Sequence, residues 1–141
     1  NIPFRIIPGI TAGVAAPTYA GIPVTHREVN HAVTFVTGHL AGTGKTELLD
    51  WEAISRGSPV LVIYMAMSKI SIIADKLIEA GRSVDEPVAI VTKATTDGQQ
   101  KHITSLGQAA ADVKQLGLEP PSIVIVGQVV NLADKLDWMG L

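Results

Sequence analysis

The apolar residues of this chain fall into short runs, separated by polar stretches that contain glycine and proline. Two of the runs, residues 59–65 and 123–126, are almost continuously apolar, which is typical of strands that are covered on both faces. Other runs are rich in β-branched residues and are bounded by turn residues, so they indicate further strands. The predicted strands are residues 4–7, 32–37, 59–65, 88–91, 103–106 and 123–126, with a last strand-like pair at Val129 and Val130.

Segments with helical spacing lie between these strands. In residues 68–80 apolar side chains recur three and four positions apart, and Gly81 supplies a stop signal. The predicted helices are residues 12–20 with Thr11 as the cap, a short helix around Trp51, residues 68–80 and residues 107–116. Because strands and helices alternate, the sequence predicts an α/β fold in which helices flank a mixed sheet. It leaves the shares of parallel and antiparallel pairing open.

Composition limits the kind of protein this sequence can encode. A length of 141 residues fits one domain, and 47% hydrophobic with 17% charged residues predicts a folded chain. Cysteine is absent, which excludes disulfides and thiolate metal sites, and no group of residues has the spacing of metal ligands. The formal net charge of −2 gives no basic field that would attract nucleic acid.

The termini and the apolar runs predict where the protein acts. The longest apolar runs, residues 59–67 and 122–130, are about half the roughly 20 residues that a membrane-spanning helix needs. The first ten residues lack the pattern of a signal peptide. We therefore expect a cytoplasmic protein that does not enter a membrane. The chain starts at Asn1 rather than at a methionine, so we expect it to be a piece of a longer protein.

The glycine-rich segment at residues 38–46 follows a strand and precedes a predicted helix, which is the context of a phosphate-binding P-loop. Counting back from Gly44-Lys45-Thr46, the first glycine of that motif falls on position 39, which is His39. The spacing is one residue off, so a surface loop is favoured. A nucleotide-binding module at this segment stays as the alternative from a different functional class.

Three motifs follow one another in the first part of the chain. They are Pro-Gly-Ile-Thr-Ala at 8–12, Tyr-Ala-Gly-Ile-Pro-Val-Thr-His-Arg at 19–27 and Val-Thr-Gly-His at 36–39. In order and spacing, this block resembles the tetrapyrrole methylase family, and within it the uroporphyrinogen-III C-methyltransferases. Further matching segments lie at residues 50–52, 62–65, 87–91, 94–96, 120–127 and 135–138, so the resemblance covers essentially the whole chain.

The resemblance implies an enzyme of two α/β domains with S-adenosylmethionine between them, of which residues 1–141 are the C-terminal domain. It implies transfer of two methyl groups to ring carbons of uroporphyrinogen III, which gives precorrin-2 on the route to sirohaem and cobalamin-type cofactors, without a metal. It also implies a homodimer. Another precorrin methyltransferase is the nearest alternative, although the Gly-Ile-Pro-Val-Thr-His-Arg run argues against it. A noncatalytic interaction domain is a further alternative.

The resemblance places five residues against the cofactor. On sequence alone, Thr11 is a helix cap, and Met65 fills the core at the end of an apolar strand. In the family, the corresponding positions meet S-adenosylmethionine. The resemblance gives the same role to Ala12, Ala94 and Ser122, which are small enough to let a flat ring approach the backbone.

Arg27 and His39 are the predicted substrate contacts. Uroporphyrinogen III carries eight carboxylates, and a guanidinium group can bind a carboxylate through two parallel hydrogen bonds. His39 follows a strand and Gly38, so we expect it to point toward the cleft, where it could bind a propionate or assist a proton transfer. The sequence assigns no catalytic base.

The chain departs from the family at one place. Many members have a Gln-Arg pair after the Ala-Thr-Thr motif, whereas this chain has Gln99, Gln100 and then Lys101. The positive charge is therefore either supplied by Lys101, one position later, or lost.

Overall fold

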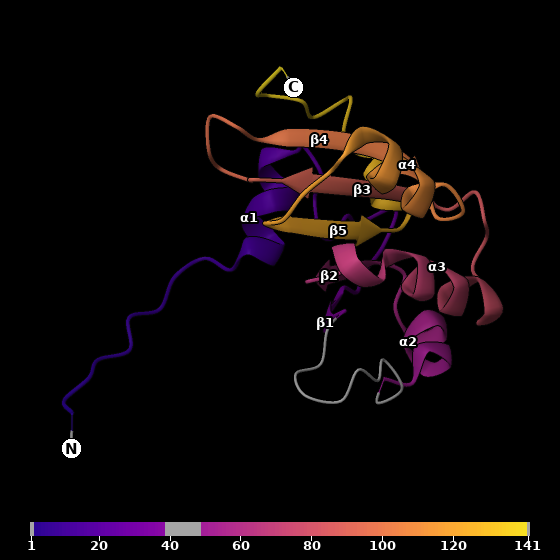
Figure 1. Cartoon of the computed structure of the whole chain (residues 1–141), viewed down its shortest axis with the longest axis horizontal. Coiled ribbons are helices and arrows are strands. Elements are labelled where there is room, and N and C mark those ends of the chain that lie inside the picture. Colours follow the sequence, from indigo (N-terminus) through magenta and orange to yellow (C-terminus); the bar gives the residue numbers. More distant parts are fainter. Residues whose placement is uncertain (1, 39–48, 141) are drawn as a thin grey trace.

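The computed structural model describes residues 2–38 and 49–140, and five strands in it form one sheet (Figure 1). The strands are β1 (Thr34–Thr37), β2 (Leu61–Tyr64), β3 (Pro87–Thr92), β4 (Gln100–Ser105) and β5 (Ser122–Val126), in the order β1-β2-β5-β3-β4. β1 and β2 are parallel, whereas the β2-β5, β5-β3 and β3-β4 pairs are antiparallel. The predicted α/β class with a mixed sheet is confirmed.

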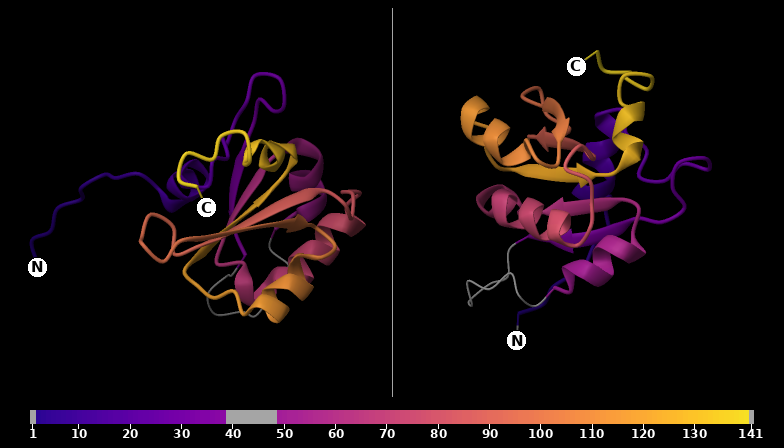
Figure 2. Two further views of the ribbon diagram at one scale, coloured as in Figure 1. Left: turned by 90° about the horizontal axis from the view of Figure 1, so that it is seen from above. Right: turned by 90° about the vertical axis from the view of Figure 1, so that its right-hand side faces the viewer.

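Helices cover both faces of this sheet (Figure 2). One face carries α2 (Trp51–Gly57), α3 (Ile70–Glu79) and α4 (Ala109–Leu116), and the other carries α1 (Ala12–Tyr19) and the 3₁₀ helix η2 (Gln128–Leu132). Successive strand residues point to opposite faces, so Leu61 and Ile63 enter the first core and Val62 enters the second. The continuous apolar runs of β2, β3 and β5 follow from this double coverage.

Local signals set the ends of the helices. Thr11 caps α1, as predicted, because its side chain accepts the Gly13 N–H at 3.4 Å. α4 ends at Gly117, which adopts the left-handed conformation with φ 61°. A 3₁₀ helix, η1 (Met67–Lys69), leads directly into α3, so the helix predicted over residues 68–80 consists of two elements.

The strand predicted at residues 4–7 is wrong. Residues 2–10 carry no secondary structure and run away from the sheet as an extended arm (Figure 1). Phe4 is 82% exposed, Ile6 85% and Ile7 86%. A strand needs a neighbouring strand to take up its hydrogen bonds, and none of the described strands pairs with this arm.

The prediction that Val129 and Val130 form a strand is wrong as well, because both residues are buried in η2. Gly127, with φ 138°, redirects the chain after β5. A Cβ atom at Gly127 would lie 2.6 Å from the carbonyl oxygen of Pro59, so the close approach of these two segments requires glycine. The two valines fill the α1 side of the core from a helical turn.

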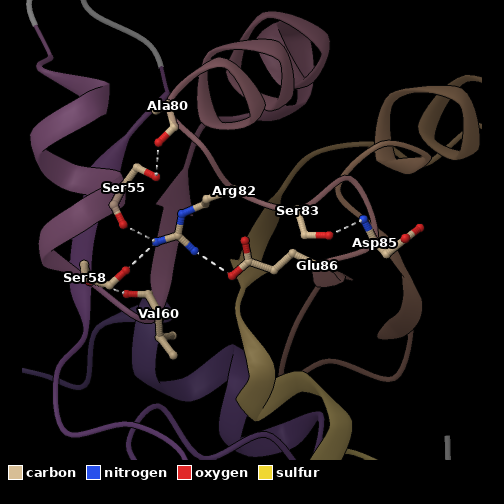
Figure 3. A network of polar contacts seen from close by, with 8 residues as sticks. All are labelled: Ser55, Ser58, Val60, Ala80, Arg82, Ser83, Asp85 and Glu86. Carbon is tan, nitrogen blue, oxygen red and sulfur yellow. Dashed lines mark hydrogen bonds and ion pairs between the residues drawn. The ribbon is translucent and has the colours of Figure 1, made fainter.

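A buried ion pair joins elements on the face of the sheet that α2, α3 and α4 cover (Figure 3). Arg82 Nη1 lies 2.7 Å from Glu86 Oε1, and both side chains are largely buried. Arg82 Nη2 also donates to the carbonyl oxygens of Ser58 and Ser55 at the end of α2. Burial raises the pKa of Glu86, and the attraction of the guanidinium opposes that shift. This network lies near the N-terminal ends of β2 and β3.

Candidate functional site

An apolar hollow lies at the end of the sheet where β2 and β3 finish. β5 runs antiparallel to both strands, so Ile123 near its start lies opposite Tyr64 and Val91 near their ends. The hollow measures about 620 Å³, within the roughly 300–1,000 Å³ that is usual for small-molecule sites. Its lining includes Ala12, Tyr64, Met65, Ala94, Pro121 and Ser122.

Four of the five residues predicted for the cofactor line this one hollow. Ala12, Met65, Ala94 and Ser122 come from four separate segments, which the antiparallel pairing brings to one end of the sheet. Thr11 stands beside them, since its hydroxyl is hydrogen-bonded to the hydroxyl of Tyr64, which is itself part of the lining. The structure therefore places the five residues together.

Tyr64 fixes the first turn of α1 against the end of β2. Its hydroxyl accepts the Gly13 N–H at 2.8 Å as well as bonding Thr11. A Cβ atom at Gly13 would lie 2.8 Å from Tyr64 Cζ and 2.9 Å from Phe35 Cδ1, so the tyrosine ring can lie close only because this residue is glycine. Tyr64 was assigned no role of its own from the sequence. A tyrosine directly before Met65, at the end of an apolar strand, was the available signal.

The backbone around the hollow is bent sharply. Met65, Lys93 and Thr95 have φ values of 51°, 48° and 66°, a left-handed conformation that residues other than glycine adopt rarely. Such conformations gather at binding and catalytic sites, where surrounding contacts hold them. Met65 follows a buried strand, yet its side chain is 59% exposed at the hollow.

Arg27 lies in a second, polar pocket of about 240 Å³, lined by Thr25, His26, Arg27, Asn30 and His31. Asn30 is 3% exposed and shapes this loop, because its Nδ2 donates to the carbonyl oxygens of Val24 and Ala32. The loop projects from the body of the chain in Figure 2 and leads into the N-terminal end of β1.

The structure does not bring Arg27 to the hollow. The polar pocket precedes the start of β1, whereas the hollow lies at the far end of β2, which runs parallel to β1. His39, the other predicted substrate contact, lies outside the described residues, as does most of the glycine-rich segment considered as a P-loop.

The run that departs from the family has a defined place. Lys101 Nζ lies 3.3 Å from Asp137 Oδ2, and the Lys101 side chain is only 6% exposed. Its charge is therefore paired with a carboxylate of this same chain. Gln99 is 7% exposed and makes two hydrogen bonds, which the sequence did not predict.

A histidine–aspartate pair lies elsewhere, where α4 packs on β4. His102 Nε2 is 2.9 Å from Asp112 Oδ2, and the Thr104 hydroxyl donates to the same oxygen. Both hydrogen bonds lower the pKa of Asp112, and the bond with His102 has the larger effect. The pair lines neither the hollow nor the polar pocket.

Residues 2–38 and 49–140 contain neither a cluster of metal ligands nor a membrane-spanning helix. No three histidine, aspartate or glutamate side chains come together there in a way that could hold a metal ion. None of the helices in these two ranges has both the length and the apolar character to cross a membrane.

Comparison with known proteins defines the class. A family model described as Tetrapyrrole (Corrin/Porphyrin) Methylases matches residues 1–110, and the chain belongs to this family. A uroporphyrinogen-III C-methyltransferase of a Sinorhizobium species is 57% identical over 140 residues, which are 99% of this chain and 50% of the relative. A siroheme synthase of Photobacterium profundum is 42% identical over 142 residues, 99% of this chain and 29% of the relative. The chain thus spans about half, or less, of the length of these relatives.

Solved structures agree with this assignment. The crystal structure of a uroporphyrin-III C-methyl transferase from Thermus thermophilus, complexed with S-adenyl homocysteine, has a TM-score of 0.77 at 30% identity. The match covers 93% of this chain and 55% of that one. A cobalt precorrin-4 methyltransferase shares the fold, with a TM-score of 0.78 at 20% identity, over 89% of this chain and 52% of the other.

Proposed function

We propose that this chain is the C-terminal half of an S-adenosylmethionine-dependent C-methyltransferase. In this proposal the enzyme methylates uroporphyrinogen III at two ring carbons and gives precorrin-2. Membership of the family and the 57% identity to a uroporphyrinogen-III C-methyltransferase support it. The observation that carries it is the apolar hollow, because residues expected to meet the methyl donor converge there from four parts of the chain.

The residues of the hollow fit the donor. The exposed thioether of Met65 offers a polarizable surface to a ring or a sulfonium group. Ala12, Ala94 and Ser122 are small, which leaves room for a flat ring beside the backbone. When bound, S-adenosylmethionine supplies an electrophilic methyl group. The residues of the chain bind and orient the donor and keep water away from the apolar wall.

The substrate side rests on Arg27 and His39. Arg27 is exposed in a pocket that also contains His26 and His31, a setting that suits a carboxylate. The polar pocket and the hollow lie at opposite ends of β1 and β2, so one copy of this half does not surround a single pyrrole ring with both. We propose that the remainder of the enzyme, as a homodimer, completes the substrate site.

Location and metal use follow from the same proposal. The enzyme acts in the cytoplasm on a small tetrapyrrole, not on nucleic acid or at a membrane. It uses no metal ion, because the methyl donor itself carries the electrophile. The formal net charge of −2 supports the view that anionic substrates are met by local groups such as Arg27.

The test is a replacement chimera, in which this chain takes the place of the matching 140 residues of the Sinorhizobium relative. We expect the chimera to bind S-adenosylhomocysteine in calorimetry and to transfer two methyl groups from labelled S-adenosylmethionine to uroporphyrinogen III. The unmodified relative is the control. We expect the isolated 141-residue chain to bind the donor much more weakly, because in the proposal half of its contacts are missing.

Product analysis separates this proposal from its alternatives. A folded chimera that binds the donor but methylates only a precorrin would support another precorrin methyltransferase. A folded chimera that binds ATP with magnesium and fails to bind S-adenosylhomocysteine would contradict the proposal and favour a nucleotide-binding module.

A further inference from the structure

The turn after β3 presents Ala94 to the hollow in a conformation that has to be held in place. Lys93 and Thr95, on either side of Ala94, both adopt the left-handed conformation. This conformation is unfavourable for residues with a Cβ atom and persists only where other contacts fix it. The position of Ala94 therefore depends on the groups that stabilise this turn.

Gln99 supplies the side-chain contact that reaches the strained residue. Its Oε1 accepts the Thr95 N–H at 2.7 Å, and its Nε2 donates to the carbonyl oxygen of Tyr19 at 3.2 Å. Because Gln99 is 7% exposed, these bonds satisfy an amide that is shielded from water. The same side chain thus joins the turn to the end of α1, across 80 positions of sequence.

The other bonds of the turn do not involve the Thr95 N–H. The Lys93 N–H donates to the carbonyl oxygen of Pro121 at 2.8 Å, and the Thr96 hydroxyl donates to that of Lys93 at 2.7 Å. Within the part of the chain that the structure describes, Gln99 is the side chain bonded to the Thr95 N–H. Loss of the Gln99 side chain would leave these bonds in place, and it would remove the bond to Thr95, the residue that directly follows Ala94.

We infer that Gln99 is a positioning residue for the methyl-donor site. It does not line the hollow, but it sets the place of the Ala94 backbone, which does. The inference rests on the proposed function, because it takes the hollow as the site of the donor. It also separates two roles in the run that departs from the family: Gln99 holds the turn, and Lys101 pairs with Asp137.

The test compares Gln99→Met with Gln100→Met in the replacement chimera. Methionine is about as long as glutamine but forms neither bond, so we expect the Kd of S-adenosylhomocysteine and the KM of S-adenosylmethionine to rise about tenfold. The KM of uroporphyrinogen III should stay within about twofold. Gln100 is exposed, and the same substitution there should change none of these constants. If Gln99 only stabilised the fold, Gln99→Met would instead reduce the fraction of enzyme that is active. The apparent kcat would then fall and both KM values would stay unchanged.

A second substitution tests the physical reason. Glycine adopts a φ of 66° without strain, so adding Thr95→Gly to Gln99→Met should restore most of the donor affinity. If the Gln99→Met variant does not fold, Gln99→Glu replaces it in the test. Glutamate keeps the acceptor for the Thr95 N–H and loses the donor to the Tyr19 carbonyl, so we expect the affinity for S-adenosylhomocysteine to fall about threefold.

The outcomes distinguish this inference from the proposed function. A chimera with Gln99 intact that does not bind S-adenosylhomocysteine contradicts the proposed function. Equal affinity for S-adenosylhomocysteine with and without the Gln99 amide would overturn only the role of Gln99. The same holds if Gln99→Met weakens binding and Thr95→Gly does not restore it.

Discussion

The hollow and the polar pocket are built from different kinds of chain. The hollow collects the ends of three strands and the start of a helix, whereas the polar pocket comes from one loop between residues 25 and 31. The shape of the hollow therefore depends on the whole sheet, and that of the pocket depends on local sequence. In the proposed function the hollow binds the donor and the pocket binds the substrate, so we expect that the two can be disturbed separately.

The largest effect is expected from Ala94→Leu. The larger side chain enters the hollow, so the Kd of S-adenosylhomocysteine for the chimera should rise by about 100-fold. The measurement is calorimetric titration, with Ala111→Leu on the exposed side of α4 as the control. Unchanged binding in a folded Ala94→Leu variant would place the donor elsewhere.

Arg27→Ala should act on the other site. Loss of a charged hydrogen-bonding group should reduce kcat/KM for uroporphyrinogen III by about 30-fold, while the Kd of S-adenosylhomocysteine stays within twofold. Steady-state kinetics and calorimetry measure the two effects, and Arg56→Ala, at an exposed arginine of α2, is the matched control. An equal loss of both quantities, or of neither, would contradict the separation of the two sites.

Asn30→Ala should loosen the polar pocket alone. It removes the bonds to the carbonyl oxygens of Val24 and Ala32, so the free energy of unfolding should fall by about 1–2 kcal/mol. Urea denaturation measures this, with Asn131→Ala at an exposed site as the control. We expect the KM of uroporphyrinogen III to rise about threefold. A comparable rise in the Kd of the donor would show that the two sites are coupled.

The smallest effect is expected from Ser122→Ala. If Ser122 matters through its size and backbone, removal of its hydroxyl should change the Kd of S-adenosylhomocysteine by less than about twofold. A loss greater than about fivefold in the same titration would instead give the hydroxyl a direct hydrogen bond to the donor.

The sequence predicted those parts of the fold that local pattern determines. The apolar runs of β2 and β5 are buried on both faces, and Thr11 and Gly117 mark helix ends where they were expected. Residues 4–7 have the composition of a strand, but a strand also requires a partner, which composition does not supply. The strand predicted at Val129 and Val130 is wrong because Gly127 turns the chain before them.

The site shows a similar division. Local pattern alone gave Thr11 as a cap and Met65 as core, and the family resemblance was needed to group them with Ala12, Ala94 and Ser122. The contacts of Gln99 and Tyr64 were not predicted, because their partners lie far away in the sequence, at Tyr19 for Gln99 and at Thr11 and Gly13 for Tyr64. Such contacts arise from strand order and from antiparallel pairing, which the sequence left open.

The central claim, that the apolar hollow holds the methyl donor, can be tested at one methyl group. Met65 is 59% exposed at the hollow, whereas Met139 is 41% exposed near the end of the chain and outside the hollow. In the chimera labelled with ¹³C at methionine methyl groups and assigned by Met→Leu variants, S-adenosylhomocysteine should shift the Met65 signal saturably and leave the Met139 signal in place. A Met65 signal that stays still while calorimetry records binding would contradict the account.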